Sequence, residues 1–301
     1  MGKSILLILF ATLQAVCQTP SETSSDTSSI PTATQWLYDA IAPGAKGTVD
    51  SVVRIWCKKT NAVGSGFILD TGYVISNNHV VQGCTPDDLE VVTSLAKEIP
   101  MGGLWFDENR DLAAIKPKVA VKGTFRIEPA RKVVVGTQLC AWGYPFAQPG
   151  PAPLLTVAFL SGFYEYQAEA KVSVKRLVLN GAVNPGNSGG PVISPEGTIV
   201  GVVVAKRTLA LPMGLESALK ALGDNKYGMQ FNGTENGKTV AYSESQLTAA
   251  LLDYYRQVSQ VFIGEAIAAS ELTGFLDEKR IPWNQPQQAP AGTKSAPKAK
   301  N

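Results

Sequence analysis

The segment 184–191 reads N-P-G-N-S-G-G-P and places glycines on both sides of Ser188, a residue type that can act as a nucleophile. Glycine allows backbone conformations that other residues avoid because of their side chains. A turn built in this way can expose the serine hydroxyl and direct successive backbone N–H groups at one point, as an oxyanion hole requires. The alternative interpretation is a glycine-rich turn with a purely structural role.

His79 is the only histidine in the chain and follows the segment 73–78, which reads Y-V-I-S-N-N. A serine hydroxyl is a weak nucleophile near neutral pH and needs an adjacent base. Histidine titrates in that range and is the usual base. A Ser–His mechanism in this chain must therefore use His79. The alternative is a core or surface histidine without a catalytic role.

Asp111 directly precedes the apolar segment 112–115, which predicts a carboxylate partly buried at the start of a strand. A catalytic triad needs such an acid to orient the imidazole ring and to stabilise its protonated form. Asp70 and Asp107 are the nearest competing aspartates, but both lie in turn contexts where we expect them to be solvated. Asp111 is therefore the candidate acid.

The three candidates occur in the order His79, Asp111, Ser188. This is the order of the chymotrypsin-type β-barrel proteases, and it differs from that of the subtilisins and of the α/β-hydrolases. Four motifs accompany the candidates: G-S-G-F-I-L at 64–69, N-N-H-V-V at 77–81, R-D-L-A-A-I-K at 110–116 and N-P-G-N-S-G-G-P-V-I at 184–193. Through these motifs, residues 48–208 resemble the HtrA/Deg branch of the trypsin-like serine proteases.

The resemblance implies an all-β fold of two six-stranded antiparallel β-barrels, perpendicular to each other, with the active site in the cleft between them. It implies Ser188 as the nucleophile, His79 as the general base and then acid, and Asp111 as the orienting acid. The backbone N–H groups of Gly186 and Ser188 would form the oxyanion hole. HtrA-type proteases usually carry PDZ domains after the barrels, whereas residues 210–283 contain no PDZ-like run of predicted strands.

The segment before the candidate nucleophile indicates the specificity pocket. Ala182 stands six positions before Ser188, near the expected base of the pocket, and Val183 lies beside it. Neither residue is charged, so the pocket lacks the counter-ion that a preference for Arg or Lys requires. The apolar segment 202–205 would form one wall. We therefore expect cleavage after small or medium aliphatic residues.

Short runs rich in β-branched residues, separated by turn signals, predict the strands that must position these candidates. Without the resemblance, they indicate an antiparallel all-β unit, and they do not decide between a sandwich and a barrel. The expected strands are 51–56, 66–69, 73–76, 89–93, 112–115, 132–142, 154–163, 172–179 and 198–205.

The pattern becomes helical after these strands. Ser243 and Gln246 have the spacing of a capping box, and apolar residues then recur at helical spacing from Leu247 to Phe275. We expect an amphipathic helix from about 244 to 280 that bends at Gly264 and packs on the β-domain. The alternative is self-association through this apolar stripe, which would produce a homo-oligomer.

The amino-terminal residues indicate export. A lysine at position 3 precedes an apolar run at 5–16, which is too short to span a bilayer and ends near small residues that suit signal cleavage. We predict a periplasmic or secreted protein without a stable membrane span after cleavage. The predicted division is a signal peptide at 1–17, a Ser/Thr/Pro-rich linker and lead-in at 18–45, the protease domain at 46–209, a helical extension at 210–283 and a disordered tail at 284–301.

Composition excludes several other classes of protein. A hydrophobic fraction of 45% excludes wholesale disorder, and a net charge of +2 does not support a nucleic-acid binder. One histidine and four cysteines without C-x-x-C do not form a zinc-site pattern, and we predict no metal or cofactor. Cys57 and Cys84 could pair in an oxidising compartment, but the sequence leaves this open, and Cys140 is predicted to be a buried thiol.

The sequence therefore predicts a serine endopeptidase that hydrolyses polypeptides in the quality control or processing of exported proteins. The alternative is a protease-fold chaperone or assembly protein that oligomerises through its C-terminal helix.

Overall fold

The computed structural model describes residues 33–35, 37, 46–128, 133–148, 150–168, 172–206, 215–235, 238–258 and 262–284. The predicted signal peptide at 1–17, most of the linker at 18–45 and all but the first residue of the predicted tail at 284–301 lie outside these residues. Over the described part of the chain, no helix has the length and apolar character needed to cross a membrane.

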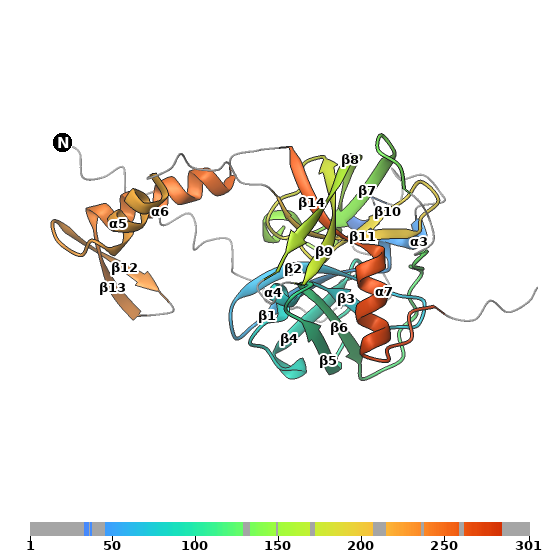
Figure 1. The fold of residues 1–301 in the computed structure, drawn as a ribbon. Coiled ribbons are helices and arrows are strands. Elements are labelled where there is room, and N and C mark those ends of the chain that lie inside the picture. Colours follow the sequence, from blue (N-terminus) through green and yellow to red (C-terminus); the bar gives the residue numbers. More distant parts are fainter. Residues whose placement is uncertain are drawn as a thin grey trace, which may run out of the picture. The chain divides into compact units, whose positions relative to one another are not determined.

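The first six strands form one antiparallel sheet in the order β4-β1-β2-β3-β6-β5 (Figure 1). These strands are β1 (Val52–Cys57), β2 (Ala62–Ile68), β3 (Val74–Ser76), β4 (Leu89–Thr93), β5 (Met101–Asp107) and β6 (Leu112–Pro117). Along β1, the side chains of Val53, Ile55 and Cys57 point to the same buried apolar cluster, as the two-residue period of a strand requires.

The next strands close into a barrel in the order β10-β11-β14-β9-β8-β7. They are β7 (Gln138–Gly143), β8 (Leu154–Gln167), β9 (Ser173–Asn180), β10 (Pro191–Ile193), β11 (Ile199–Lys206) and β14 (Ile263–Ala268). A second apolar cluster, which includes Leu139, Leu179 and Val203, draws its members from all six of these strands. Two six-stranded antiparallel sheets confirm the predicted all-β fold.

A third apolar cluster joins the two sheets. It combines Phe67 and Leu112 of the first sheet with Trp142 and Ile267 of the barrel. The helix α7 (Ala269–Glu278) contributes Leu272, Phe275 and Leu276, all fully buried. Burial of one apolar helix face in this cluster fixes α7 to both sheets.

The short helix α3 (Lys46–Val49) precedes β1. Three further helical turns lie between strands: α4 (Asn78–Val81) and the 3-10 turns η3 (Pro86–Asp88) and η4 (Pro145–Ala147).

The single helix predicted from 244 to 280 is wrong. The chain forms α6 (Glu244–Val258), then β14, then α7. The predicted capping box is confirmed, because Ser243 N–H donates to Gln246 Oε1 at 2.9 Å and Gln246 N–H donates to Ser243 Oγ at 3.2 Å. β14 pairs with β11 on one side and β9 on the other, and these ladders override the local helical pattern.

A folded segment is inserted between β11 and β14, which are neighbours in the barrel. It contains α5 (Leu215–Asp224), the antiparallel hairpin β12 (Gln230–Glu235) and β13 (Lys238–Ser243), and α6, with α5 packed against α6. The region predicted as helical therefore also contains strands. The domain boundary predicted at 209 leaves out β14 and α7, which belong to the barrel and its core.

Candidate active site

His79 and Asp111 form a hydrogen-bonded pair on the first sheet. His79 lies on α4, soon after β3, and Asp111 is the last residue of the turn between β5 and β6. The Nδ1 atom of His79 is 2.7 Å from Oδ2 of Asp111, and the backbone N–H of His79 donates to Oδ1 at 2.9 Å. Both carboxylate oxygens therefore hold the same residue, which leaves Nε2 as the ring nitrogen available for proton transfer.

The backbone of Asp111 has a left-handed conformation, with a φ of 57°. Aspartate tolerates this conformation better than most residues, because its short polar side chain bonds locally. Asn77, which is fully buried, holds the strained residue by donating its Nδ2–H to the Asp111 carbonyl oxygen at 2.8 Å. The carboxylate is thus aimed by a backbone that the surrounding structure fixes.

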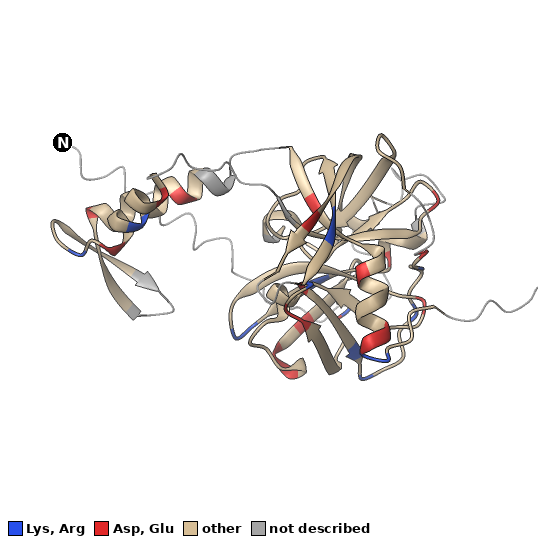
Figure 2. Ribbon diagram, in the orientation of Figure 1, with Lys and Arg blue, Asp and Glu red and all other residues tan. Residues whose placement is uncertain are grey.

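Arg110 connects the turn before β6 to the C-terminal helix. Its guanidinium is 2.6 Å from Asp107 and 2.7 Å from Glu278, and its Nε is 3.4 Å from Glu271. Hydrogen bonding to Glu278, supported by Asp107, raises the pKa of Arg110 above its ordinary value. Glu271 also accepts the backbone N–H of Lys175 in β9 at 3.2 Å. The acidic residues of α7, red in Figure 2, therefore link the first sheet to the barrel.

Ser188 lies in a tight loop that leads into β10 of the barrel. Gly186 and Gly189 on either side have positive φ values of 97° and 84°, which confirms the conformational need for glycine. The Ser188 hydroxyl donates to the carbonyl oxygen of Val204 in β11 at 3.3 Å. In this structure the serine proton is therefore not directed at His79, and the two residues come from different sheets.

Two backbone N–H groups of this loop have no hydrogen-bond partner in the part of the chain that the structure describes. Neither the Gly186 nor the Ser188 N–H donates a hydrogen bond to another described residue. The carbonyl of Pro185, which precedes Gly186, accepts the Phe146 N–H at 2.6 Å. Because a trans peptide directs its N–H opposite to its C=O, this bond fixes the direction of the Gly186 N–H. Unpaired donors beside a serine hydroxyl are what an oxyanion hole requires.

Comparison with known families agrees with this geometry. A family model described as a trypsin-like peptidase domain matches residues 64–202, which contain all three candidates. These residues are a trypsin-like peptidase domain. The chain is 31% identical to "Protease Do-like 1, chloroplastic" of Arabidopsis thaliana, over 47% of this chain and 33% of the relative. It is 31% identical to a "Probable periplasmic serine endoprotease DegP-like" of Hahella chejuensis, over 48% of this chain and 30% of the relative.

The solved structures with this fold include proteases. The active form of the Rv3671c protease from M. tuberculosis superimposes with a TM-score of 0.55 at 18% identity, covering 90% of this chain and 96% of that one. The HtrA-type protease AlgW with tripeptide gives 0.53 at 20% identity, covering 79% and 64%. These likenesses concern the fold. The chain spans about a third of the length of the curated relatives it matches.

The predicted pocket residues of the trypsin-like domain lie between β9 and the nucleophile loop. Val183 is buried, and its Cγ2 would be 2.5 Å from a Cβ at Gly264 of β14. The carbonyl of Ala182 accepts the Thr156 hydroxyl of β8 at 3.4 Å. The Val183 side chain therefore packs against β14, a strand that the sequence did not predict, and the backbone of Ala182 is held by β8.

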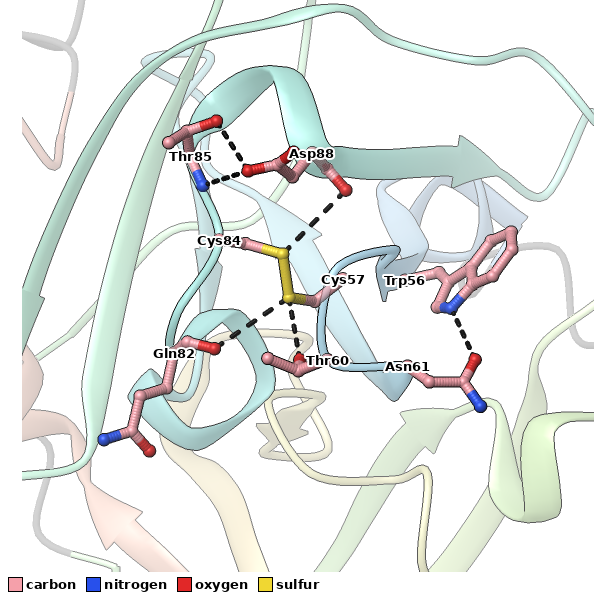
Figure 3. The surroundings of a disulfide bond; sticks show 8 residues. All are labelled: Trp56, Cys57, Thr60, Asn61, Gln82, Cys84, Thr85 and Asp88. Carbon is pink, nitrogen blue, oxygen red and sulfur yellow. Dashed lines mark hydrogen bonds between the residues drawn. A yellow bond between two sulfur atoms is a disulfide. The ribbon is translucent and has the colours of Figure 1, made fainter. Parts of the chain in front are cut away.

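The structure also contains the disulfide that the sequence left open. Cys57 at the end of β1 is bonded to Cys84, which follows α4, across a sequence separation of 27 residues (Figure 3). The Thr60 hydroxyl donates to Cys57 Sγ at 2.9 Å. The bond closes the segment that carries His79. Cys140 is free, and its partial burial raises the pKa of its thiol.

A cleft of about 900 Å³ lies elsewhere on the surface, lined by residues 70–73, 116–124 and 126. Two of its cations already have carboxylate partners, because Lys118 is 2.7 Å from Asp87 and Arg126 is 2.9 Å from Asp70. The lining includes none of the three candidates, so this cleft is separate from the candidate site.

Sequence analysis missed several residues that position the site. Ser65 and Arg110 belong to the motifs identified in the sequence. The residues that they bond, Gly186 and Glu278, lie more than a hundred positions away in the chain. Asn77 likewise belongs to the N-N-H-V-V motif, and its bond to Asp111 crosses 34 residues. The motifs indicated that these residues lie near the site, but only the folded structure shows which residues they contact.

Proposed function

We propose that this protein is a serine endopeptidase in which Ser188, His79 and Asp111 form the catalytic triad. The observation that carries the proposal is the His79–Asp111 pair, in which both carboxylate oxygens bond the histidine, at 2.7 and 2.9 Å. The unused N–H groups of Gly186 and Ser188 support it. The serine-protease names of the relatives support the same reaction class.

The proposed reaction is acyl transfer in two steps. The Ser188 hydroxyl rotates away from the Val204 carbonyl, and Oγ attacks the peptide carbonyl as His79 Nε2 takes its proton. The N–H groups of Gly186 and Ser188 bond the oxyanion. His79 then protonates the leaving amine, and water hydrolyses the acyl-enzyme with His79 again acting as base. Asp111 holds the ring tautomer and stabilises the imidazolium.

We propose small or medium aliphatic residues as the preferred side chains before the cleaved bond. Ala182 and Val183 offer no charge to pair with a basic substrate residue, and Val183 is tightly packed against Gly264. A pocket that lacks a carboxylate leaves a substrate ammonium or guanidinium unpaired. A peptide library cleaved by the protein, with the products identified by mass spectrometry, gives this preference directly.

We propose that the protein acts after export, in the periplasm or outside the cell. The apolar run at 5–16 and the Cys57–Cys84 disulfide support an oxidising compartment. The DegP-like relative is named as periplasmic. Fractionation of cells that produce the protein, followed by sequencing of its amino terminus, tests both the location and the cleavage after residue 17.

The chaperone or assembly alternative has one observation in its favour. The helix α6 exposes Leu251, Leu252, Tyr254 and Tyr255, and such side chains can bind unfolded chains or a second copy. The Ser188→Ala variant separates this alternative from proteolysis. Suppression of substrate aggregation by that variant, or a dimeric or larger mass in solution, would support a binding role beside catalysis.

Labelling with a fluorophosphonate probe tests the peptidase proposal, because the probe reacts with an activated serine. We expect modification at Ser188, located by peptide mapping, and no labelling of heat-unfolded protein. Ser188→Ala and His79→Ala should reduce hydrolysis of labelled casein by at least about a thousandfold. Ser161→Ala, at an exposed serine of β8, is the matched control and should retain full activity. Wild-type hydrolysis by Ser188→Ala would contradict the proposal.

A further inference from the structure

Ser65 is a fully buried residue of β2 whose hydroxyl is bonded in both directions. Its Oγ–H donates to the carbonyl oxygen of Gly186 at 2.6 Å. The same Oγ accepts the backbone N–H of Tyr144 at 2.9 Å. A buried hydroxyl that both donates and accepts a hydrogen bond is held in one orientation, because rotation would leave a buried polar group unpaired.

The backbone of Ser65 bonds the other end of the nucleophile loop. Its N–H donates to the carbonyl oxygen of Ser188 at 2.8 Å, and its own carbonyl accepts the Ser76 hydroxyl at 2.8 Å. Ser65 thus holds residues 186 and 188 simultaneously. It belongs to the first sheet, which carries His79, whereas the loop it holds belongs to the barrel.

Gly186 is the part of this loop that most needs to be held. Its φ of 97° is open only to a residue without a side chain, and a Cβ there would lie 2.3 Å from the Tyr144 carbonyl oxygen. The freedom that permits this conformation also permits others at low cost. Two hydrogen bonds select it: the Phe146 N–H holds the peptide before Gly186, and the Ser65 hydroxyl holds the peptide after it.

We propose that Ser65 is a positioning residue, whose hydroxyl fixes the peptide after Gly186 so that the Gly186 and Ser188 N–H groups remain directed at the same oxyanion. The inference rests on the proposed peptidase function. Loss of the hydroxyl leaves the Gly186 carbonyl and the Tyr144 N–H buried without this partner. The peptide after Gly186 then rotates to satisfy this carbonyl elsewhere, which displaces the following Ser188 N–H. The Gly186 N–H stays held through the Phe146 bond, so the two donors no longer converge on the oxyanion.

The test compares Ser65→Ala with Ser76→Ala. Both variants remove one hydroxyl that is fully buried and hydrogen-bonded, and both touch the same backbone. The Ser76 hydroxyl bonds only the Ser65 carbonyl among the described residues and does not reach Gly186. A loss that comes from general destabilisation should appear equally in both variants, whereas a loss of positioning should appear in Ser65→Ala alone.

The measured quantity is the rate constant for fluorophosphonate labelling of Ser188, because the phosphoryl oxygen of the probe occupies the oxyanion hole. We expect Ser65→Ala to react about 10- to 100-fold more slowly than wild type, and Ser76→Ala to react at close to the wild-type rate. For a cleaved peptide, kcat should fall and KM should change little. Thermal unfolding of each variant gives the temperature at which both remain folded.

Equal labelling rates for the two folded variants would overturn the positioning role. If Ser65→Ala does not fold, Ser65→Cys preserves the size of the side chain, but its thiol is a weak donor that cannot reproduce the 2.6 Å bond to the Gly186 carbonyl. A wild-type labelling rate in Ser65→Cys would then also overturn the positioning role. Failure of the wild-type protein to label at Ser188 contradicts the peptidase proposal itself, so the two failures are distinguishable.

Discussion

Removal of the Cys57–Cys84 disulfide should lower the free energy of unfolding by about 3.5 kcal/mol. The bond joins residues separated by 27 positions, and in the chain-entropy model a loop of that length restricts the unfolded chain by this amount. Cys57 is fully buried and Cys84 is 9% exposed. Substitution is therefore a cleaner perturbation than a reducing agent, which must first reach the sulfurs.

The double variant Cys57→Ala, Cys84→Ala should be compared with the oxidised wild type by equilibrium unfolding in guanidinium chloride, followed by tryptophan fluorescence. For a domain of this size, the expected loss corresponds to a fall in the unfolding temperature of about 7–14 °C. Cys140→Ala is the matched control, since it removes the free thiol and leaves the disulfide intact.

Activity and stability should separate in this variant. His79 lies inside the closed loop, but Asp111 holds it through two hydrogen bonds that the substitutions do not touch. We therefore expect most of the hydrolytic activity to remain at 20 °C and to disappear at a lower temperature than in the wild type. A loss of unfolding free energy below about 1 kcal/mol would refute the loop-entropy argument. An early loss of activity in fully folded protein would show that the bond positions the histidine.

Three further substitutions have defined outcomes. Asp111→Asn keeps a residue that tolerates a φ of 57°, so stability should be unchanged while kcat falls by about 10⁴-fold; Asp111→Ala should lose the same activity and about 1 kcal/mol of stability as well. Arg110→Gln should lower the free energy of unfolding by about 1–2 kcal/mol, because it leaves the partly buried carboxylates of Asp107 and Glu271 without their cation; in 0.5 M NaCl the stability difference from wild type should be smaller. Gly264→Ala should lower the free energy of unfolding by about 1–3 kcal/mol, because the new methyl group would lie 2.5 Å from Val183 Cγ2. The displaced Val183 should also change the preferred substrate residue. An unchanged peptide-library profile would show that β14 does not shape the specificity pocket.

The sequence predicted those parts of the molecule that depend on local pattern. Alternating β-branched runs produced most of the strands, because the residues of one strand alone determine which of its faces is apolar. The spacing around His79, Asp111 and Ser188 identified the candidate site, and the structure brings the first two into contact. The capping box formed by Ser243 and Gln246 could also be predicted, because its two residues are only three positions apart.

The parts that were missed depend on distant partners. The residues of β14 fit a helical stripe as well as a strand, and only the ladders to β9 and β11 decide between the two. The Cys57–Cys84 pairing depends on the distance between two segments in the folded chain. Ser65 and Arg110 have the same limitation, since each acts through residues on another sheet or helix.

The position of β14 has a consequence for biosynthesis. The ribosome releases the chain from its amino terminus, so the three triad candidates emerge before the inserted segment and before β14. Until β14 follows, β9 and β11 each have an unpaired edge, and the barrel that carries Ser188 remains open. α7, which anchors Arg110, emerges later still. Translation of the inserted segment therefore delays completion of the barrel until nearly all of the described residues have been made.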